Sequence, residues 1–263
     1  MKQRILTAIA AILIFIPLVV IGGMTFNVFV YLLATIALLE LIRMRRITVV
    51  YVPVTLAVIC LWLLLLPSAD MLQPFSKADL LMLFTLFLLA YTVMAKNKFT
   101  FDDAGFMLLA IIYVGMGFYY LIETRDGTSA GGLANIFYVL VVIWATDTGA
   151  YFCGRAFGKQ KLWPKISPNK TIEGAVGGIV LAAAVGIIFH IAFPFPYDMI
   201  TVITVTVLVS IAGQIGDLVE SAFKRHYGVK DAGKILPGHG GILDRLDSLL
   251  FVLPLLHFIH FFA

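Results

Sequence analysis

Long apolar runs separated by short polar connections make up most of the chain. A helix needs about 20 apolar residues to cross the hydrocarbon core of a bilayer. Nine segments approach that length: 5–21, 27–42, 49–66, 79–95, 104–122, 133–153, 174–193, 199–222 and 247–262. The pattern predicts an all-α, polytopic integral membrane helix bundle with about nine transmembrane helices. Two of the polar connections, 154–173 and 223–246, are longer than the others.

The distribution of basic residues orients these predicted helices. If the N-terminus lies in the cytoplasm and the spans alternate, only Lys77 and Arg125 of the 19 Lys and Arg residues fall on the outer side. Cytoplasmic loops of membrane proteins carry an excess of Lys and Arg. We therefore expect a cytoplasmic N-terminus, two long cytoplasmic loops, and a multi-pass protein of the cell's inner (cytoplasmic) membrane.

Composition supports the membrane assignment and narrows the function. Of the 263 residues, 61% are hydrophobic and 13% are charged, and the mean hydropathy is +1.01. These values exclude an ordinary soluble domain. The net charge of +4 follows from the membrane topology, so we expect no nucleic-acid partner. We divide the chain into an N-terminal region of about five spans, 1–132, and a C-terminal catalytic region, 133–263, which contains both long loops.

The eighth predicted span, 199–222, carries charge on one helical face. Asp217 and Glu220 are three residues apart, and Ser221 and Lys224 follow on the same face. Ionisable residues inside a membrane are energetically expensive and normally face protein or water. We interpret Asp217 as a metal ligand. The alternative is a structural pair within the membrane, for example with Lys224.

A second acidic pair, Asp244 and Asp247, begins the ninth predicted span. Asp244 together with Asp217 would hold a divalent ion from two helices, because Mg²⁺ is usually bound by one or two protein carboxylates plus water and substrate phosphates. Arg245 lies between the two acids and is a candidate phosphate clamp. The alternative is that these carboxylates cap the helix N-terminus, a role that we assign to Asp247 in preference to Asp244.

The segment 237–241 reads Pro-Gly-His-Gly-Gly and directly precedes this acidic pair. Glycines let backbone N–H groups approach an anion closely, and the neighbouring Lys230, Lys234 and Arg245 neutralise phosphate charge. This combination favours a phosphate-binding loop. His239 would donate to phosphate or shape the turn, and such glycine-rich loops are also found as simple turns.

Asp147 places another carboxylate inside a predicted span. We expect it to face the same cavity as Asp217; the alternative is a buried carboxylate with hydrogen-bond partners.

The following loop, 154–173, contains five basic residues, which suit either a substrate phosphate or the ordinary positive-inside bias. Residues 167–171 followed by Glu173 resemble a turn leading into a capped helix. Five acids near span ends are expected to be solvated: Glu40, Asp70, Asp79, Asp102 and Asp103.

Three segments resemble a known family. The stretch SAFKRHYGVKDAGKILPGHGGILDRLD at 221–247 looks like the signature of phosphatidate cytidylyltransferases (CDP-diacylglycerol synthases). The blocks DTGAYFCGRAFGK at 147–159 and ISPNKTIEG at 166–174 resemble segments typical of its bacterial members. The specific resemblance covers about the C-terminal half, whereas the first ~130 residues match only as hydrophobic spans.

This resemblance implies a CTP-dependent and Mg²⁺-dependent nucleotidyltransferase of phospholipid biosynthesis. CTP and phosphatidate would give CDP-diacylglycerol and pyrophosphate, with membrane lipid around the protein, a homodimer as the assembly and a second, monovalent ion (K⁺) beside Mg²⁺. The implied metal ligands are Asp217 and Asp244. The implied catalytic residues are Lys224, Arg225, Asp231, His239, Arg245 and Asp247. The implied substrate-binding residues are Ser221, Lys230, Gly240, Gly241, Lys170 and Asp147.

Two other functions use the same kinds of residue. A CTP-dependent kinase of a polyprenol lipid would transfer the γ-phosphoryl group and release CDP instead of pyrophosphate. An ion-coupled secondary transporter would use Asp147, Asp217 and Glu220 as ion or proton sites. The transporter has no need for the pattern in 223–246, and the chain shows no inverted repeat.

Overall fold

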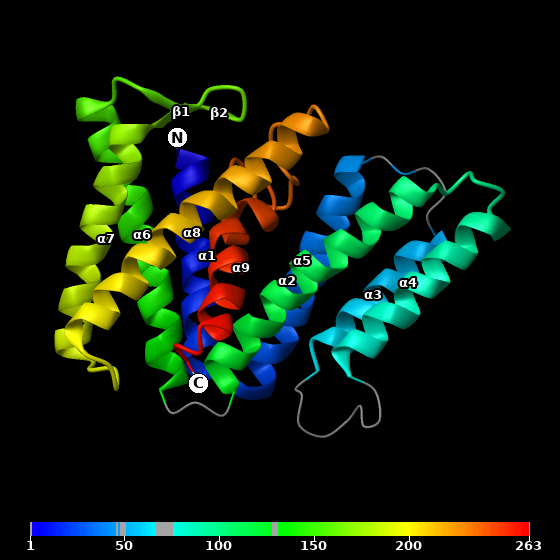
Figure 1. The fold of residues 1–263 in the computed structure, drawn as a ribbon, viewed down its shortest axis with the longest axis horizontal. Coiled ribbons are helices and arrows are strands. Elements are labelled where there is room, and N and C mark those ends of the chain that lie inside the picture. The colour runs from blue at the N-terminus through cyan, green and yellow to red at the C-terminus, as the bar shows by residue number, and fades with distance from the viewer. Residues whose placement is uncertain (1, 46, 48–50, 67–75, 128–130, 263) are drawn as a thin grey trace. The chain divides into compact units, whose positions relative to one another are not determined.

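The computed structural model describes residues 2–45, 47, 51–66, 76–127 and 131–262. Within these residues it contains nine helices and one two-stranded antiparallel sheet (Figure 1). The elements are α1 (Lys2–Ile21), α2 (Gly23–Arg45), α3 (Tyr51–Leu64), α4 (Lys77–Met94), α5 (Phe101–Asp126), α6 (Gly132–Phe157), β1 (Lys161–Trp163), β2 (Ser167–Thr171), α7 (Ile172–Ala192), α8 (Met199–His226) and α9 (Leu243–Phe258). Asp70, predicted to be solvated, lies outside the described residues.

The predicted all-α polytopic membrane fold is confirmed. Among the described residues, six helices are long and apolar enough to cross a membrane: α2, α4, α5, α6, α7 and α8. The apolar part of α1 and the whole of α3 are shorter, and α9 has 16 residues. Each of the nine apolar runs of the sequence corresponds to one of these nine helices.

The chain forms two compact units. The first comprises Met1–Thr128 together with Asp231–Leu243, and the second comprises Ser129–Lys230 together with Asp244–Ala263. Most of the connection between α8 and α9, from Asp231 onward, therefore belongs to the first unit, whereas both helices belong almost entirely to the second.

The first unit is built around α2 and α5, which pack against each other with fully buried Phe26, Met107 and Phe118.

The helices α4 and α5 both begin with a capping box, in which a hydroxyl and an Asp satisfy each other's backbone N–H groups. In α5 this acid, Asp103, also forms an ion pair with Arg45 (2.8 Å). Asp103 was expected to be solvated; it is half-buried because this pairing covers it. Asp79 and Asp102 are exposed, as predicted.

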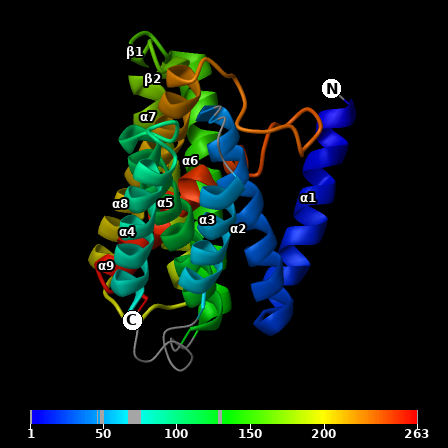
Figure 2. The ribbon, with the colours of Figure 1, turned by 90° about the vertical axis from the view of Figure 1, so that its right-hand side faces the viewer.

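The segment 231–243 completes the first unit. Figure 2 shows this orange segment reaching the N-terminal part of α1, where the hydroxyl of Thr7 donates a hydrogen bond to the carbonyl of Pro237 (3.0 Å).

Close packing of small residues holds the second unit together. The helices α6 and α7 run side by side over most of their length (Figure 1). Glycine permits this approach, because a Cβ on Gly178 would lie 2.7 Å from the carbonyl oxygen of Thr146. On the other side of α6, the Thr146 hydroxyl donates to Ser210 of α8 (2.9 Å). The helices α8 and α9 also touch closely, since a Cβ on Gly216 would lie 2.9 Å from the Asp247 carbonyl oxygen.

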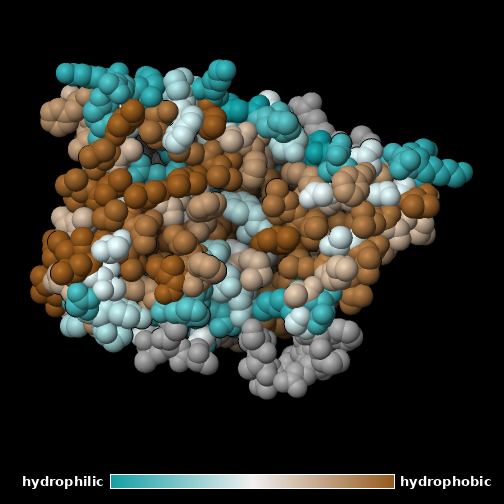
Figure 3. All heavy atoms as spheres, viewed as in Figure 1, coloured by the Kyte–Doolittle hydropathy of each residue, from teal (hydrophilic) through white to brown (hydrophobic). Residues whose placement is uncertain are grey.

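The outer surface of α7 is apolar. Its exposed side chains include Val176, Val180, Ile188 and Ile191. In Figure 3 hydrophobic side chains cover the middle of the face formed by α7 and α8, and hydrophilic ones gather at the end that carries the β1–β2 hairpin. A helix surface of this kind is suited to contact with lipid chains.

The loop predicted between 154 and 173 contains this hairpin. Residues 167–171 form β2, so the turn predicted there is wrong; the turn lies at 164–166, where the N–H of Ile166 donates to Trp163 (3.1 Å). The predicted capped helix is confirmed, because the Thr171 hydroxyl accepts the N–H of Gly174 (3.1 Å) at the start of α7.

The tight contact between α6 and α7 predicts an asymmetry between two identical substitutions. We expect Gly178→Ala to destabilise the detergent-purified protein by about 1–3 kcal/mol, because the added methyl group collides with a helix backbone. Gly105→Ala in α5, where the added atom meets nothing within 4 Å, is the matched control and should be neutral or stabilising by up to ~1 kcal/mol. Thermal unfolding measures both; equal melting temperatures would contradict the packing argument.

Candidate functional site

The C-terminal end of α8, which is predicted to face the cytoplasm, carries a buried cluster of three charged side chains. Lys224 donates to Oδ1 of Asp244 on α9 (2.7 Å) and forms a second ion pair with Glu220 one turn earlier on α8. The side chains of Lys224, Glu220 and Asp244 are 13%, 0% and 4% exposed. The structural pair considered for Asp217 with Lys224 is therefore formed by Glu220 instead, one turn further along the helix.

Asp217 lies in a more open position on α8. Its Oδ2 forms an ion pair with Lys170 of β2 (2.6 Å), and its Oδ1 accepts a hydrogen bond from Ser221 (3.3 Å). The side chain of Asp217 is 34% exposed and that of Lys170 is 27% exposed. Of the two predicted metal ligands, Asp217 is thus the one that a soluble ligand reaches from outside.

Two further carboxylates interact electrostatically with Asp217. Asp147 on α6 lies within electrostatic range of Asp217, Lys170 and Arg245, and Asp247 on α9 lies within range of Asp217 and Asp147. Asp147 is exposed on this unit, whereas Asp247 is buried and accepts the N–H of Ser248 (2.7 Å). Asp247 is the fifth residue of α9, so the prediction that it caps the helix is wrong: the helix begins one turn earlier than expected.

Two other predicted residues flank this cluster. Arg225 is exposed and donates from Nε to the carbonyl of Ile166 in the β1–β2 hairpin (3.2 Å). This bond ties the hairpin, and with it Lys170, to the end of α8. Lys230 is exposed at the last position of Ser129–Lys230, the first of the two segments that form the second unit.

The remaining predicted residues belong to the first unit, in the segment 231–243. Asp231 is exposed, and His239 and Gly240 lie in a tight turn. The N–H of His239 donates to Leu236 (2.9 Å), and the N–H of Leu236 donates to Gly240 (2.9 Å). Gly238 and Gly240 have φ values of +77° and +88°, so the turn requires glycine at both positions.

Glu40 of α2 binds the same segment and was missed by the sequence analysis. It was expected to be solvated; it is 3% exposed, and its two carboxylate oxygens accept the N–H groups of Ile242 (3.1 Å) and Leu243 (3.0 Å). The expectation failed because α2 continues to Arg45, which leaves Glu40 inside the helix. The same rule that singled out Asp217, that a carboxylate within an apolar run needs a protein partner, identifies Glu40 as well.

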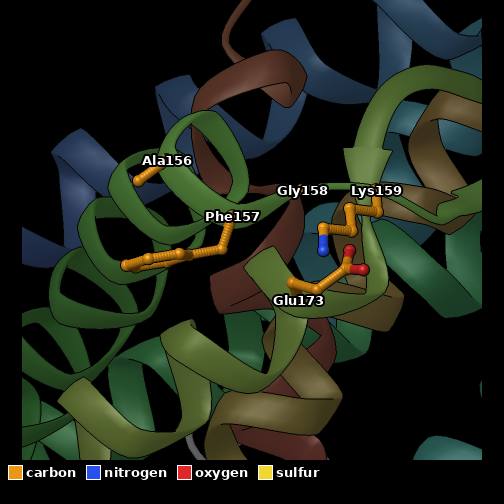
Figure 4. Close-up of a pocket in the computed structure, with 5 residues that line it drawn as sticks. All are labelled: Ala156, Phe157, Gly158, Lys159 and Glu173. Carbon is orange, nitrogen blue, oxygen red and sulfur yellow. The ribbon is translucent and has the colours of Figure 1, made fainter.

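A surface hollow of about 550 Å³ lies where α6 ends, lined by Ala156, Phe157, Gly158, Lys159 and Glu173. Figure 4 shows the ammonium group of Lys159 and the carboxylate of Glu173 pointing toward one another. Glu173 also accepts the N–H of Gln160 (3.2 Å). The lining does not include Asp147 or Asp217, so this hollow is separate from the acidic cluster.

The donor set suits a hard cation held by few protein ligands. Among the residues that the structure describes, no group of three or more His, Cys, Asp or Glu side chains converges as in a closed metal cage. Mg²⁺ usually takes only one or two carboxylates and keeps water and phosphate oxygens as its other ligands. Asp217, which is partly exposed and within electrostatic range of two other carboxylates, fits that requirement.

The fold and this cluster define a polytopic membrane protein with acidic and basic side chains gathered at one end of its helices. Comparison with known families matches residues 2–263 to the cytidylyltransferase family. The protein of Bacillus subtilis (strain 168) named phosphatidate cytidylyltransferase is 50% identical over 262 residues, covering 98% of this chain and 97% of that protein. Relatives of the same name from Staphylococcus haemolyticus and Staphylococcus aureus (strain COL) are 50% and 46% identical over 259 residues, covering 98% of both chains. The chain belongs to the cytidylyltransferase family.

The two lysine–aspartate pairs predict different effects of the same substitution. We expect Lys224→Met to destabilise the protein by about 3–5 kcal/mol, because it leaves two buried carboxylates without their cation. Lys170→Met, which breaks a half-exposed pair, is the matched control and should cost about 0–1 kcal/mol. Chemical unfolding in mild detergent measures both. Equal losses of stability would show that Lys224 is not held in a buried triad.

Proposed function

We propose that this protein transfers the cytidylyl group of CTP to phosphatidate, which gives CDP-diacylglycerol and pyrophosphate. The observation that carries the proposal is the match of the whole chain to relatives named phosphatidate cytidylyltransferase, at 50% identity over 98% of the chain. The apolar helices support it as well, because one substrate is a membrane lipid and the other is soluble.

The reaction is a substitution at phosphorus. A phosphate oxygen of phosphatidate attacks the α-phosphorus of CTP, a new P–O bond forms, and the bond to the bridging oxygen breaks as pyrophosphate leaves. The nucleophile is anionic near neutral pH, so the reaction needs no general base. Its obstacles are repulsion between anions and the charge that builds on the leaving group. A site rich in Lys, Arg and Asp suits these needs.

The metal ions of the proposal are Mg²⁺ and a monovalent K⁺ beside it. Asp217 and Asp244 would hold them, with Asp147 and Asp247 nearby in the same unit. Bound Mg²⁺ would neutralise phosphate charge and orient the triphosphate. Asp217 is engaged by Lys170 and Asp244 by Lys224; with a cation at Asp217, the Lys170 ammonium group would be available to a phosphate.

Lys170 is the better placed of these two lysines to make that change. Its side chain is 27% exposed, against 13% for Lys224, and its partner Asp217 is partly exposed too. In the proposed reaction Lys170 would bind a phosphate of CTP beside the carboxylate of Asp217 that would hold a cation, whereas Lys224 keeps Glu220 and Asp244 together. The other predicted residues keep the roles that the resemblance implies: Ser221, Arg225, Lys230, Asp231, His239, Gly240, Gly241 and Arg245.

The proposed site faces the cytoplasm, in the inner membrane, and the enzyme works as a homodimer. The excess of Lys and Arg in the predicted cytoplasmic segments supports this orientation. CTP then reaches the site from the aqueous side, and the phosphatidate headgroup reaches the same level from the inner leaflet.

The test of the function is release of pyrophosphate from CTP by the detergent-purified protein. We expect release only when phosphatidate and Mg²⁺ are both present, and loss of release in EDTA with recovery on adding Mg²⁺ back. The physical reason is that the triphosphate needs a cation before another anion can approach it. The control is the same preparation with diacylglycerol, which lacks the attacking phosphate, in place of phosphatidate.

Two results would contradict the proposal. Release of CDP instead of pyrophosphate would favour a CTP-dependent lipid kinase, which transfers the γ-phosphoryl group. No turnover by a folded preparation would favour a transporter, with Asp147 and Asp217 as ion sites.

The orientation has its own test by cysteine labelling. A cysteine replacing exposed Gln160, beside the β1–β2 hairpin, should react with a membrane-impermeant maleimide only after the cytoplasmic side is opened. A cysteine replacing exposed Pro196, in the connection between α7 and α8, should react in intact cells. The opposite pattern would invert the proposed topology.

A further inference from the structure

The contact between Glu40 and the start of α9 is not explained by any role assigned above. Glu40 projects from α2, and its two oxygens separately accept the backbone N–H groups of Ile242 and Leu243. These are donors at a helix N-terminus, which have no partner within the helix itself. A buried carboxylate is stable there because the N–H groups and the positive end of the helix dipole compensate its charge.

The chain around this carboxylate is shaped to admit it. Gly233 and Gly241 both lie against the Glu40 side chain, and a Cβ on either would overlap its carboxylate. Thr7 of α1 binds the same segment from another side, through the carbonyl of Pro237. The two glycines therefore leave space for the Glu40 carboxylate, and the two N–H groups bind it.

We propose that Glu40 is a positioning residue for the nucleotidyl transfer, which fixes the segment 231–243 and the first turn of α9. We call the contact of Glu40 with Gly233, Gly241, Ile242 and Leu243 the Glu40 clasp. Asp244 follows Leu243 directly in the sequence, and Arg245 is the next residue. The clasp thus sets where α9 begins, and so where the Asp244 carboxylate and the Arg245 guanidinium project. This inference rests on the proposed function.

Glu40 acts through the backbone and not by touching substrate. Both of its oxygens are engaged by N–H groups, and the side chain is almost fully buried. A phosphate group would have to displace it to reach the same donors. The clasp therefore also keeps the positive end of α9 from binding phosphate, which leaves Asp244 and Arg245 as the groups that α9 offers at its start.

The test compares Glu40→Gln with the control Asp79→Asn. Both replace a carboxylate that accepts backbone N–H groups, but Asp79 caps α4 at an exposed position. We expect Glu40→Gln to lower kcat for pyrophosphate release on the order of tenfold to a hundredfold, with little change in KM for CTP, because misplacing reacting groups slows the chemical step. Asp79→Asn should leave kcat unchanged.

A second readout does not depend on activity. Lys234 is exposed within the clasped segment, so trypsin cuts after it whenever the segment detaches. Cleavage at Lys234, followed by mass spectrometry, should be several-fold faster in Glu40→Gln than in the wild type or Asp79→Asn, because local opening controls proteolysis. Gly241→Ala, which changes the backbone that contacts Glu40, should likewise make cleavage at Lys234 several-fold faster. The double variant should be no worse than either single one, since both remove one interaction.

Each outcome decides the inference. Faster cleavage together with lower kcat supports it. Unchanged cleavage, or faster cleavage with unchanged kcat, overturns it. If Glu40→Gln does not fold, Gly241→Ala and Glu40→Asp decide by the same two measurements. If the wild type releases no pyrophosphate, the proposed function fails, the positioning role fails with it, and the cleavage rates show separately whether the clasp holds the segment.

Discussion

Every charge placed among apolar helices must find a partner within the protein, and this constraint governs the site. Lys224 lies between Glu220 and Asp244, and Glu40 receives two backbone N–H groups. Removing any one of these groups leaves a charge or a polar backbone group in a low-dielectric interior, which is costly. The Glu40 contacts lie at the start of α9, and Lys224 joins α8 to α9. Charge neutralisation thus shapes the local structure, and the proposed reaction would use the same residues to bind phosphate.

Small residues make those pairings reachable. In the second unit, Gly178 and Gly216 let the backbones of neighbouring helices come into direct contact. A membrane provides no hydrophobic drive for helices to associate, so association depends on such close packing and on hydrogen bonds like that of Thr146 with Ser210. A larger residue at Gly216 would push against the backbone of α9, and α8 and α9 are the helices that carry Lys224 and Asp244. The charged pairs therefore depend on the small residues at the helix contacts.

Much of this could be predicted from the sequence. The apolar runs gave the helices, since length and hydropathy alone define a span, and the family was identified from three short segments. The charged face of α8 was also predicted, because helical periodicity places Asp217, Ser221 and Lys224 together. These inferences use local sequence only, and the structure leaves the helical assignments intact.

Non-local pairing could not be predicted in the same way. Glu40 was assigned to solvent because it lies near the end of an apolar run, and nothing near it in sequence indicates that its partners are 202 and 203 residues away. Asp247 was assigned to a helix cap because the ninth apolar run begins at 247, whereas α9 itself begins at Leu243. The β1–β2 hairpin was missed because residues 154–173 were interpreted as a loop and 167–171 as a turn; both strands are short, and an edge strand such as β2 tolerates Pro168.

Asp217 is the residue on which the proposed cation site used with CTP depends most directly. The direct measurement is electron paramagnetic resonance of Mn²⁺, as a substitute for Mg²⁺, titrated with CTP into the wild-type protein and into Asp217→Asn. The account predicts protein-bound Mn²⁺ in the wild type and its loss in Asp217→Asn, with the melting temperature preserved because the Asp217 pair with Lys170 is partly exposed. Equal Mn²⁺ binding by both proteins would contradict it.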